Sequence, residues 1–158
     1  MRLLPESYQN FITNRLLELS GILLLLLSCF IFLSLLSFSP LDPSINNLTS
    51  SEISNLGGRI GASISDLLVQ LFGYSSFILT VVLLSWSYKL IFHKYLPLIA
   101  LHTFLLPFFL TSISLFINLL NISSVNGFIS NEIMISLLDF GLLSTNLNYI
   151  LLLISVLF

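Results

Sequence analysis

The sequence predicts an all-α integral membrane protein: a bundle of four transmembrane helices, the last one incomplete, with a short outer amphipathic helix. Of its 158 residues, 56% are hydrophobic and only 8% are charged, and the mean hydropathy is +1.06. Soluble domains carry about 25% charged residues, so this chain has too few charges to cover a surface in contact with water. We therefore expect lipid to surround most of its side chains.

Long uncharged stretches mark the expected spans, because a spanning helix needs about 20 residues and a charge at its centre costs about 2.5–3.5 kcal/mol. The purely apolar part of the last stretch is Tyr149–Phe158, and ten or twelve residues reach about 18 Å as a helix and stop short of a full crossing. We expect a cytoplasmic N-terminus at residues 1–15 and one membrane domain at 16–158, with spans at 16–38, 73–92, 95–120 and 147–158 and outer loops at 39–72 and 121–146.

The first span has one alternative, a secretory signal peptide. Its apolar core is longer than that of a usual signal peptide, and residues 37–40 (Ser-Phe-Ser-Pro) are a poor cleavage site because of the proline. A retained anchor is therefore favoured. In the third span, Pro107 is expected to kink the helix without ending it.

The distribution of cations predicts the orientation, because lysine and arginine near span ends stay on the cytoplasmic side. With a cytoplasmic N-terminus, four cations lie inside (Arg2, Arg15, Lys89 and Lys94) and one, Arg59, lies outside. The turn between the second and third spans then also faces the cytoplasm. The residues expected to form an aromatic and basic belt beside this turn are Trp86, Tyr88 and Lys89.

A polar stripe predicts the outer amphipathic helix. Arg59 begins it, and polar residues recur four, seven and eleven positions later, which is one face of a helix. The opposite face is apolar, so the helix is expected to lie in the membrane interface before the chain turns into the second span at Gly73. The alternative is that the second span starts early and runs long. The residues of the stripe are Arg59, Ser63, Asp66 and Gln70.

Small residues at the start of this helix predict close packing. Gly57 and Gly61 are spaced four apart, as are Gly58 and Ala62, and such spacing lets helix backbones approach closely. Glycines at a helix start are equally consistent with a turn. Asp66 is expected either to pair weakly with Arg59 or to face a neighbouring helix or subunit. The candidate residues for helix packing or an oligomer contact are Gly57, Gly58, Gly61, Ala62 and Asp66.

A weak internal repeat relates the two outer segments. A shift of 69 residues places residues 57–61 (Gly-Gly-Arg-Ile-Gly) on residues 126–130 (Asn-Gly-Phe-Ile-Ser), and Gln70 on Asp139. This indicates a duplicated unit of span, outer amphipathic helix and span. Coincidence is the alternative in a chain so rich in isoleucine, leucine and serine.

The sequence holds no motif for catalysis, for a cofactor or for a metal ion. It lacks the phosphate-binding loop, the His-Glu-x-x-His zinc motif and the nucleophile elbow, and its one cysteine is Cys29. His102 falls within the third span, where no acidic or lysine partner could form a proton relay with it, so a neutral imidazole is favoured. Twelve charges summing to −2 leave no basic patch for nucleic acid.

The order of several segments resembles the membrane domain of the FtsK/SpoIIIE-type bacterial DNA translocases. The resemblance extends over residues 15–92 and is topological beyond them. The segments that carry it are residues 15–21 (Arg-Leu-Leu-Glu-Leu-Ser-Gly), 37–44 (Ser-Phe-Ser-Pro-Leu-Asp-Pro-Ser), 55–62 (Asn-Leu-Gly-Gly-Arg-Ile-Gly-Ala), 66–68 (Asp-Leu-Leu) and 71–73 (Leu-Phe-Gly).

This resemblance implies a four-span anchor in the bacterial inner membrane at the division septum, with both ends cytoplasmic. In that family a linker and a hexameric ATP-driven motor follow the anchor, and this chain is expected to be truncated before both. The implied role is therefore tethering and positioning for chromosome segregation, without enzyme activity. The implied partners are membrane lipid, other copies of the chain and other division proteins, with no direct contact to nucleic acid.

A fragment or subunit of a small membrane transporter or channel is the alternative function. That class is expected to carry charged groups inside its spans or helices broken at mid-membrane. In this sequence, His102 and Pro107 are the features that point towards it.

Overall fold

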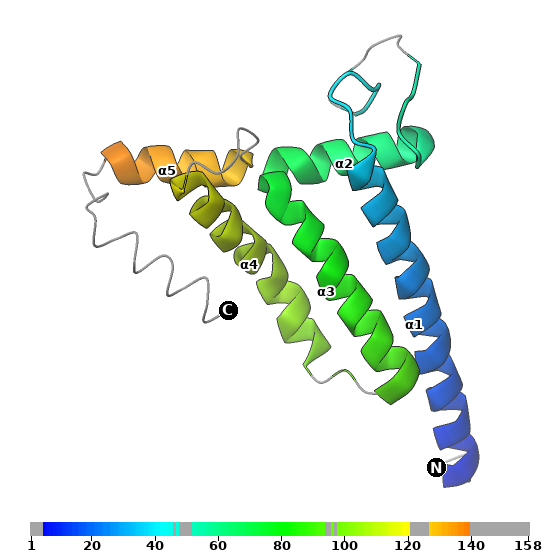
Figure 1. Ribbon diagram of the computed structural model, residues 1–158. Coiled ribbons are helices and arrows are strands. Elements are labelled where there is room, and N and C mark those ends of the chain that lie inside the picture. Colours follow the sequence, from blue (N-terminus) through cyan, green and yellow to red (C-terminus); the bar gives the residue numbers. More distant parts are fainter. Residues whose placement is uncertain are drawn as a thin grey trace.

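The computed structural model describes residues 5–45, 47, 52–93, 96, 98–120 and 127–139, and these parts of the chain are helical, without strands. The all-α prediction is thus confirmed. The helices are α1 (Glu6–Leu36), α2 (Gly58–Phe72), α3 (Ser76–Tyr88), α4 (Ile99–Leu119) and α5 (Phe128–Asp139), with a 3₁₀ turn at Gly73–Ser75 and a π-helical turn at Lys89–His93. Figure 1 shows α1, α3 and α4 side by side, with α2 and α5 lying across one end of them.

Three helical stretches in the described ranges are long and apolar enough to cross a membrane: Ser7–Leu36, Gly58–His93 and Ile99–Leu119. With 31 residues, α1 is about 46 Å long, whereas the 21 residues of α4 reach about 31 Å. The N-terminal part of α1 therefore extends past the turn between α3 and α4 (Figure 1). The fourth expected span, 147–158, lies outside the described residues.

Small and hydroxylated side chains bring α1 and α3 together. The Ser28 hydroxyl donates to the Thr80 carbonyl at 2.8 Å, and the Ser87 hydroxyl donates to the Gly21 carbonyl at 2.8 Å. A Cβ atom on Gly21 would lie 2.7 Å from the Ile91 side chain, so the two backbones approach closely at this position. Close approach through small residues is a usual way for membrane helices to pack, since lipid tails offer no hydrophobic drive between them.

The bend between α2 and α3 depends on Gly73. Its φ of 60° and ψ of −141° lie in a region that residues with a side chain rarely adopt. At this residue the chain leaves the outer helix and turns into the bundle, and Figure 1 shows α2 lying across the ends of α1 and α3. The outer amphipathic helix is thus separate from the span that follows it.

α5 joins α2 in the outer layer, with α4 beneath it (Figure 1). The Ser114 hydroxyl of α4 lies 3.0 Å from that of Ser130, and Asn118 donates to the Asn131 side chain at 2.7 Å. Just before α5, Gly127 lies directly against the backbone at the end of α2. The outer layer is therefore held both to the spans and within itself. Within α4, the helix continues past Pro107.

Replacing Gly127 with alanine should loosen the outer layer. The added Cβ would lie 2.7 Å from the Phe72 Cα and would also meet the Leu71 carbonyl, and backbone atoms cannot move aside cheaply. We expect Gly127→Ala to lower the free energy of unfolding by about 1–3 kcal/mol, measured by circular dichroism during thermal unfolding in detergent micelles. Ser136→Ala, at an exposed position of α5, is the control and should leave stability nearly unchanged. Equal stability of both variants would contradict the close contact.

Candidate functional site: the outer polar cluster

A buried carboxylate organises the loop between α1 and α2. Asp42 is 4% exposed and accepts three hydrogen bonds, from the Ser54 backbone N–H at 3.0 Å, the Ser54 hydroxyl at 2.8 Å and the Asn55 N–H at 2.9 Å. The Ser54 backbone N–H contributes most to holding the pKa of the Asp42 carboxyl below its ordinary value of 3.8, and burial opposes it. The Asp42 carboxylate thus holds the beginning and the end of this loop together.

Asn55 connects this loop to both neighbouring helices. Its side-chain amide is buried and donates to the Ser34 carbonyl at 2.8 Å and to the Ser37 carbonyl at 3.3 Å, near the end of α1. Its side-chain oxygen accepts the Gly57 N–H at 2.9 Å, at the start of α2. Helix ends leave such groups without a partner inside the helix, so one side chain satisfies groups at two helix ends.

The predicted small residues fit α2 onto the end of α1. Cβ atoms on Gly57 and Gly61 would lie 2.5 and 2.7 Å from the Ser34 hydroxyl oxygen, and Ala62 is 2% exposed. Gly58 instead faces open space and adopts a φ of +62°, so it serves the turn. The structure thus places Gly57, Gly61 and Ala62, but not Gly58, in packing within one chain. A contact with a second chain through them stays a prediction.

Asp66 fastens the loop to α2. It accepts hydrogen bonds from the Ser44 hydroxyl at 2.5 Å and from the Gln70 side chain at 2.8 Å. Ser44 is buried, and its backbone N–H donates to the Asn47 carbonyl at 2.9 Å. Together, Asp42, Ser44, Asn55, Gly57, Gly61 and Asp66, with their partners Ser34 and Ser54, form what we call the outer polar cluster.

The contacts of the outer polar cluster that the structure describes hold the shape of the loop and of α2. Its carboxylates accept hydrogen bonds from the chain itself, and neither of them pairs with a histidine or cysteine that could act as a base or nucleophile in the contacts described above. Among the described residues, no group of three His, Cys, Asp or Glu side chains could hold a metal ion. What the arrangement can do is hold the described parts of the loop against α1 and α2 at one face of the membrane domain.

His102 lies at the other end of the bundle from this cluster. Because α4 begins at Ile99, His102 falls in its first turn, about 5 Å along the axis. Its ring lies edge-on to that of Trp86 on α3, with centroids 6.5 Å apart. The histidine therefore lies near the turn between the two spans, closer to that turn than the sequence predicts.

The central residues of the cluster, Asp42 and Asn55, were not among the predicted site residues. The signal that could have found them is a pattern of turn formers: Asp42 stands between two prolines, and Asn55 comes two residues before a pair of glycines. Asp and Asn side chains in such positions commonly bond to nearby backbone groups.

The fold and the cluster define a class: an all-α multi-pass membrane domain whose first and second spans are joined by a loop, held by Asp42 and Asn55, and by the amphipathic helix α2. A family model described as the 4TM region of DNA translocase FtsK/SpoIIIE matches residues 13–136. The chain belongs to this family.

Curated relatives agree with this assignment. The DNA translocase FtsK of Azospirillum brasilense is 33% identical over 86 residues, which are 53% of this chain and 14% of that protein. The corresponding protein of Bradyrhizobium diazoefficiens is 31% identical over 58% of this chain and 11% of its own length, and that of Vibrio vulnificus is 40% identical over 48% and 8%. The chain thus matches about a tenth of these relatives' length. No solved structure gives a significant match.

Replacing Asp42 with asparagine should open the loop. The variant loses hydrogen bonds to a charged acceptor, and we expect the free energy of unfolding to fall by about 1.5–3 kcal/mol. Thermal unfolding in micelles at neutral pH measures this loss, and faster protease cleavage within residues 39–57 should accompany it. Glu52→Gln, at an exposed carboxylate of the same loop, is the matched control. A similar loss in both variants would mean that the loop responds to net charge alone.

The lowered pKa of Asp42 also sets a pH dependence. A carboxyl with a depressed pKa contributes its full stability above its ordinary value of 3.8, and this contribution disappears as the pH falls through the lower, folded value. The stability difference between wild type and Asp42→Asn should therefore be constant from neutral pH down to about pH 4 and shrink below it. A difference that already shrinks between pH 7 and 5 would show that another group controls the loop.

Replacing Gly61 with alanine should separate α2 from α1. The new Cβ would press on the Ser34 hydroxyl and on the Asn55 side chain, both of which are buried. Overpacking of this kind costs about 1–3 kcal/mol, measurable by the same thermal unfolding. Gly58→Asn is the matched control, because the site is open and asparagine tolerates a positive φ. If Gly61→Ala were as stable as Gly58→Asn, the packing of α2 on α1 would not be close.

Proposed function

We propose that this chain is the membrane anchor of an FtsK-type DNA translocase, and that it tethers and positions the translocase in the bacterial inner membrane at the division septum. The match of residues 13–136 to the family's 4TM region is the observation that carries the proposal. The relatives that share this region are named DNA translocases, and the motor activity that this name implies is attributed here to parts of those proteins beyond the matched region. The chain itself acts without catalysis.

The arrangement of charges supports a cytoplasmic N-terminus. Figure 1 shows the N-terminus at the end of the bundle where α3 turns into α4, and α2 and α5 at the opposite end. Arg15 and Lys89 belong to the first end, and the second holds Arg59 together with an excess of carboxylates. Since lysine and arginine favour the cytoplasmic side, the outer polar cluster faces the periplasm.

A structured outer layer suits a positioning role. The outer polar cluster fixes the loop on α2, and α5 extends the same layer, so a partner would meet a preformed surface and not a flexible linker. We propose that other division proteins contact this layer and that the chain assembles with further copies of itself. The transporter or channel alternative gains no support, because α3 and the part of α4 after His102 contain no Asp, Glu, Lys, Arg or His side chain.

Reporter fusions test the orientation and the location together. A fusion of alkaline phosphatase after Glu52 should be active, because this enzyme works only outside the cytoplasm, and one after Phe92 should be inactive. A fluorescent fusion at the N-terminus should collect at mid-cell in dividing bacteria. An active fusion after Phe92 would overturn the orientation, and an even distribution around the cell would overturn the septal role.

A further inference from the structure

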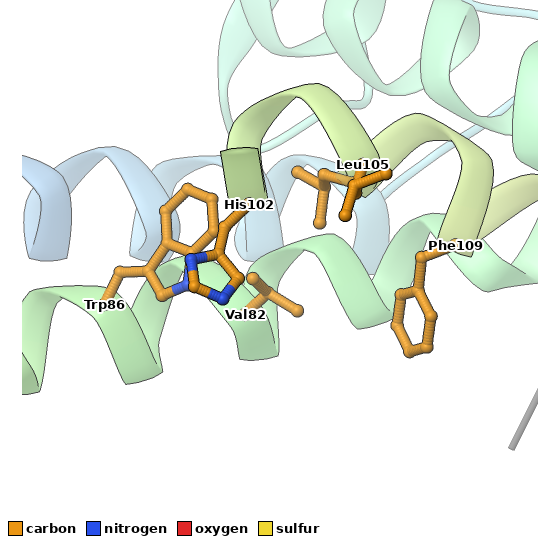
Figure 2. A pocket seen from close by; sticks show the side chains of 6 residues that line it. Val82, Trp86, His102, Leu105 and Phe109 are labelled. Atoms are coloured by element: carbon orange, nitrogen blue, oxygen red, sulfur yellow. The ribbon is translucent and has the colours of Figure 1, made fainter. Parts of the chain in front are cut away.

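A groove lies between α3 and α4 in the half of the bundle near their connecting turn. It has a volume of about 240 Å³ and belongs to segments that are apolar enough to lie in a membrane. Figure 2 shows side chains from both helices around the same space, with the Trp86 and His102 rings next to each other at one end and Phe109 at the other. Its lining residues are Val82, Trp86, His102, Leu105, Leu106 and Phe109.

The two ends of the groove differ in chemistry. Most of its length is aliphatic or aromatic, whereas the end near the turn offers the indole N–H of Trp86 and the imidazole of His102. Lys89 follows Trp86 by three positions, so it lies on the same side of the helix one turn closer to the membrane surface. Lys89 is exposed, and its ammonium group adds a positive charge to this end.

An apolar groove with a polar, positively charged end matches the two parts of a phospholipid molecule, its acyl chain and its headgroup. The groove, at about 240 Å³, is smaller than the 300–1,000 Å³ or so of pockets for drug-sized molecules, which leaves room for part of one hydrocarbon chain. Basic pockets between spanning helices near the membrane surface bind anionic lipid headgroups. We propose that the α3–α4 groove binds one acyl chain of an anionic phospholipid, with the lipid phosphate beside Lys89, Trp86 and His102.

The leaflet that supplies this lipid rests on the proposed function. With a cytoplasmic N-terminus, the polar end of the groove opens at the inner leaflet. The chemical class of the lipid, in contrast, follows from the groove and the neighbouring Lys89. Binding can therefore be tested on purified protein, where neither orientation in the cell nor septal location affects the result.

Trp86 provides the measurement, because it is the only tryptophan in the sequence and lines the groove. The full chain is reconstituted into vesicles containing phosphatidylcholine and phosphatidylglycerol, with bromine on the acyl chains of one lipid or the other. Bromine quenches indole fluorescence only at short range. At equal bromine content, we expect brominated phosphatidylglycerol to occupy the groove about fivefold more readily, the preference that one lysine near the surface confers.

Two substitutions test the role of the charge. Lys89→Gln should abolish the preference for phosphatidylglycerol, and Lys89→Arg should keep it. Arg59→Gln, a cation at the opposite end of the bundle, is the matched control and should also keep it. Circular dichroism confirms that each variant remains helical, so that a lost preference is not mistaken for unfolding.

A displaced reporter separates groove binding from general lipid contact. In the double variant Trp86→Phe, Val81→Trp the indole lies at a position of α3 that is 63% exposed and does not line the groove. We expect both lipids to quench it equally. If this reporter showed the same preference as Trp86, the lipid would be enriched around the whole protein and the proposal would be overturned.

Other outcomes also overturn the proposal. Equal quenching of Trp86 by both lipids, or a preference that survives Lys89→Gln, would exclude a site for an anionic lipid. If neither lipid quenched Trp86 but both quenched the reporter at position 81, protein would fill the groove. That protein would be either residues 140–158 or a second copy of the chain. A cell in which the chain does not collect at mid-cell would contradict the proposed function and leave the quenching result unaffected.

Discussion

The hydrogen bonds of the Asn55 side chain are the interaction on which the outer half of the molecule depends. The buried side-chain amide of Asn55 joins the last turns of α1 to Gly57, the residue before α2, while its backbone N–H donates to the Asp42 carboxylate that closes the loop. Because α2 leads through Gly73 into α3, the position of α2 also sets where the second span starts. A local polar contact therefore determines how the apolar helices α1 and α3 pack against each other. Lipid contacts alone would not define this packing.

Hydropathy and charge spacing predicted an all-α membrane domain, because the cost of placing a charge in lipid dominates other local preferences, and the described residues hold three helices long and apolar enough to span a membrane. Hydropathy and charge spacing define the first and last residues of each helix less well. α1 begins at Glu6, well before the expected span, since a helix can continue into water once its hydrocarbon part is formed. α4 begins at Ile99, four residues after its expected start, which moves His102 towards the membrane surface. The polar stripe beginning at Arg59 predicted the outer helix, observed at Gly58–Phe72.

The candidate site was predicted in part. Spacing identified Gly57 and Gly61 as contact residues, but their partner Ser34 lies on another helix, and no local pattern names a partner across a loop. The shift that relates the outer segments places Gly61 on Ser130. In the structure Gly61 lies against Ser34 of the preceding span, and Ser130 hydrogen-bonds to Ser114 of the preceding span. This similarity between the two contacts is visible in the folded structure and not in the sequence alone.

The bonds between the spans have a consequence for how the domain responds to its surroundings. Ser28, Ser75 and Ser87 each donate to a carbonyl oxygen on a neighbouring helix, and neither partner ionises at any physiological acidity. Added salt has no charge to screen there. The hydrogen bonds between these helices are therefore insensitive to acidity and salt. The outer polar cluster contains carboxylates, so its hydrogen bonds would respond to such changes before the spacing of the helices does.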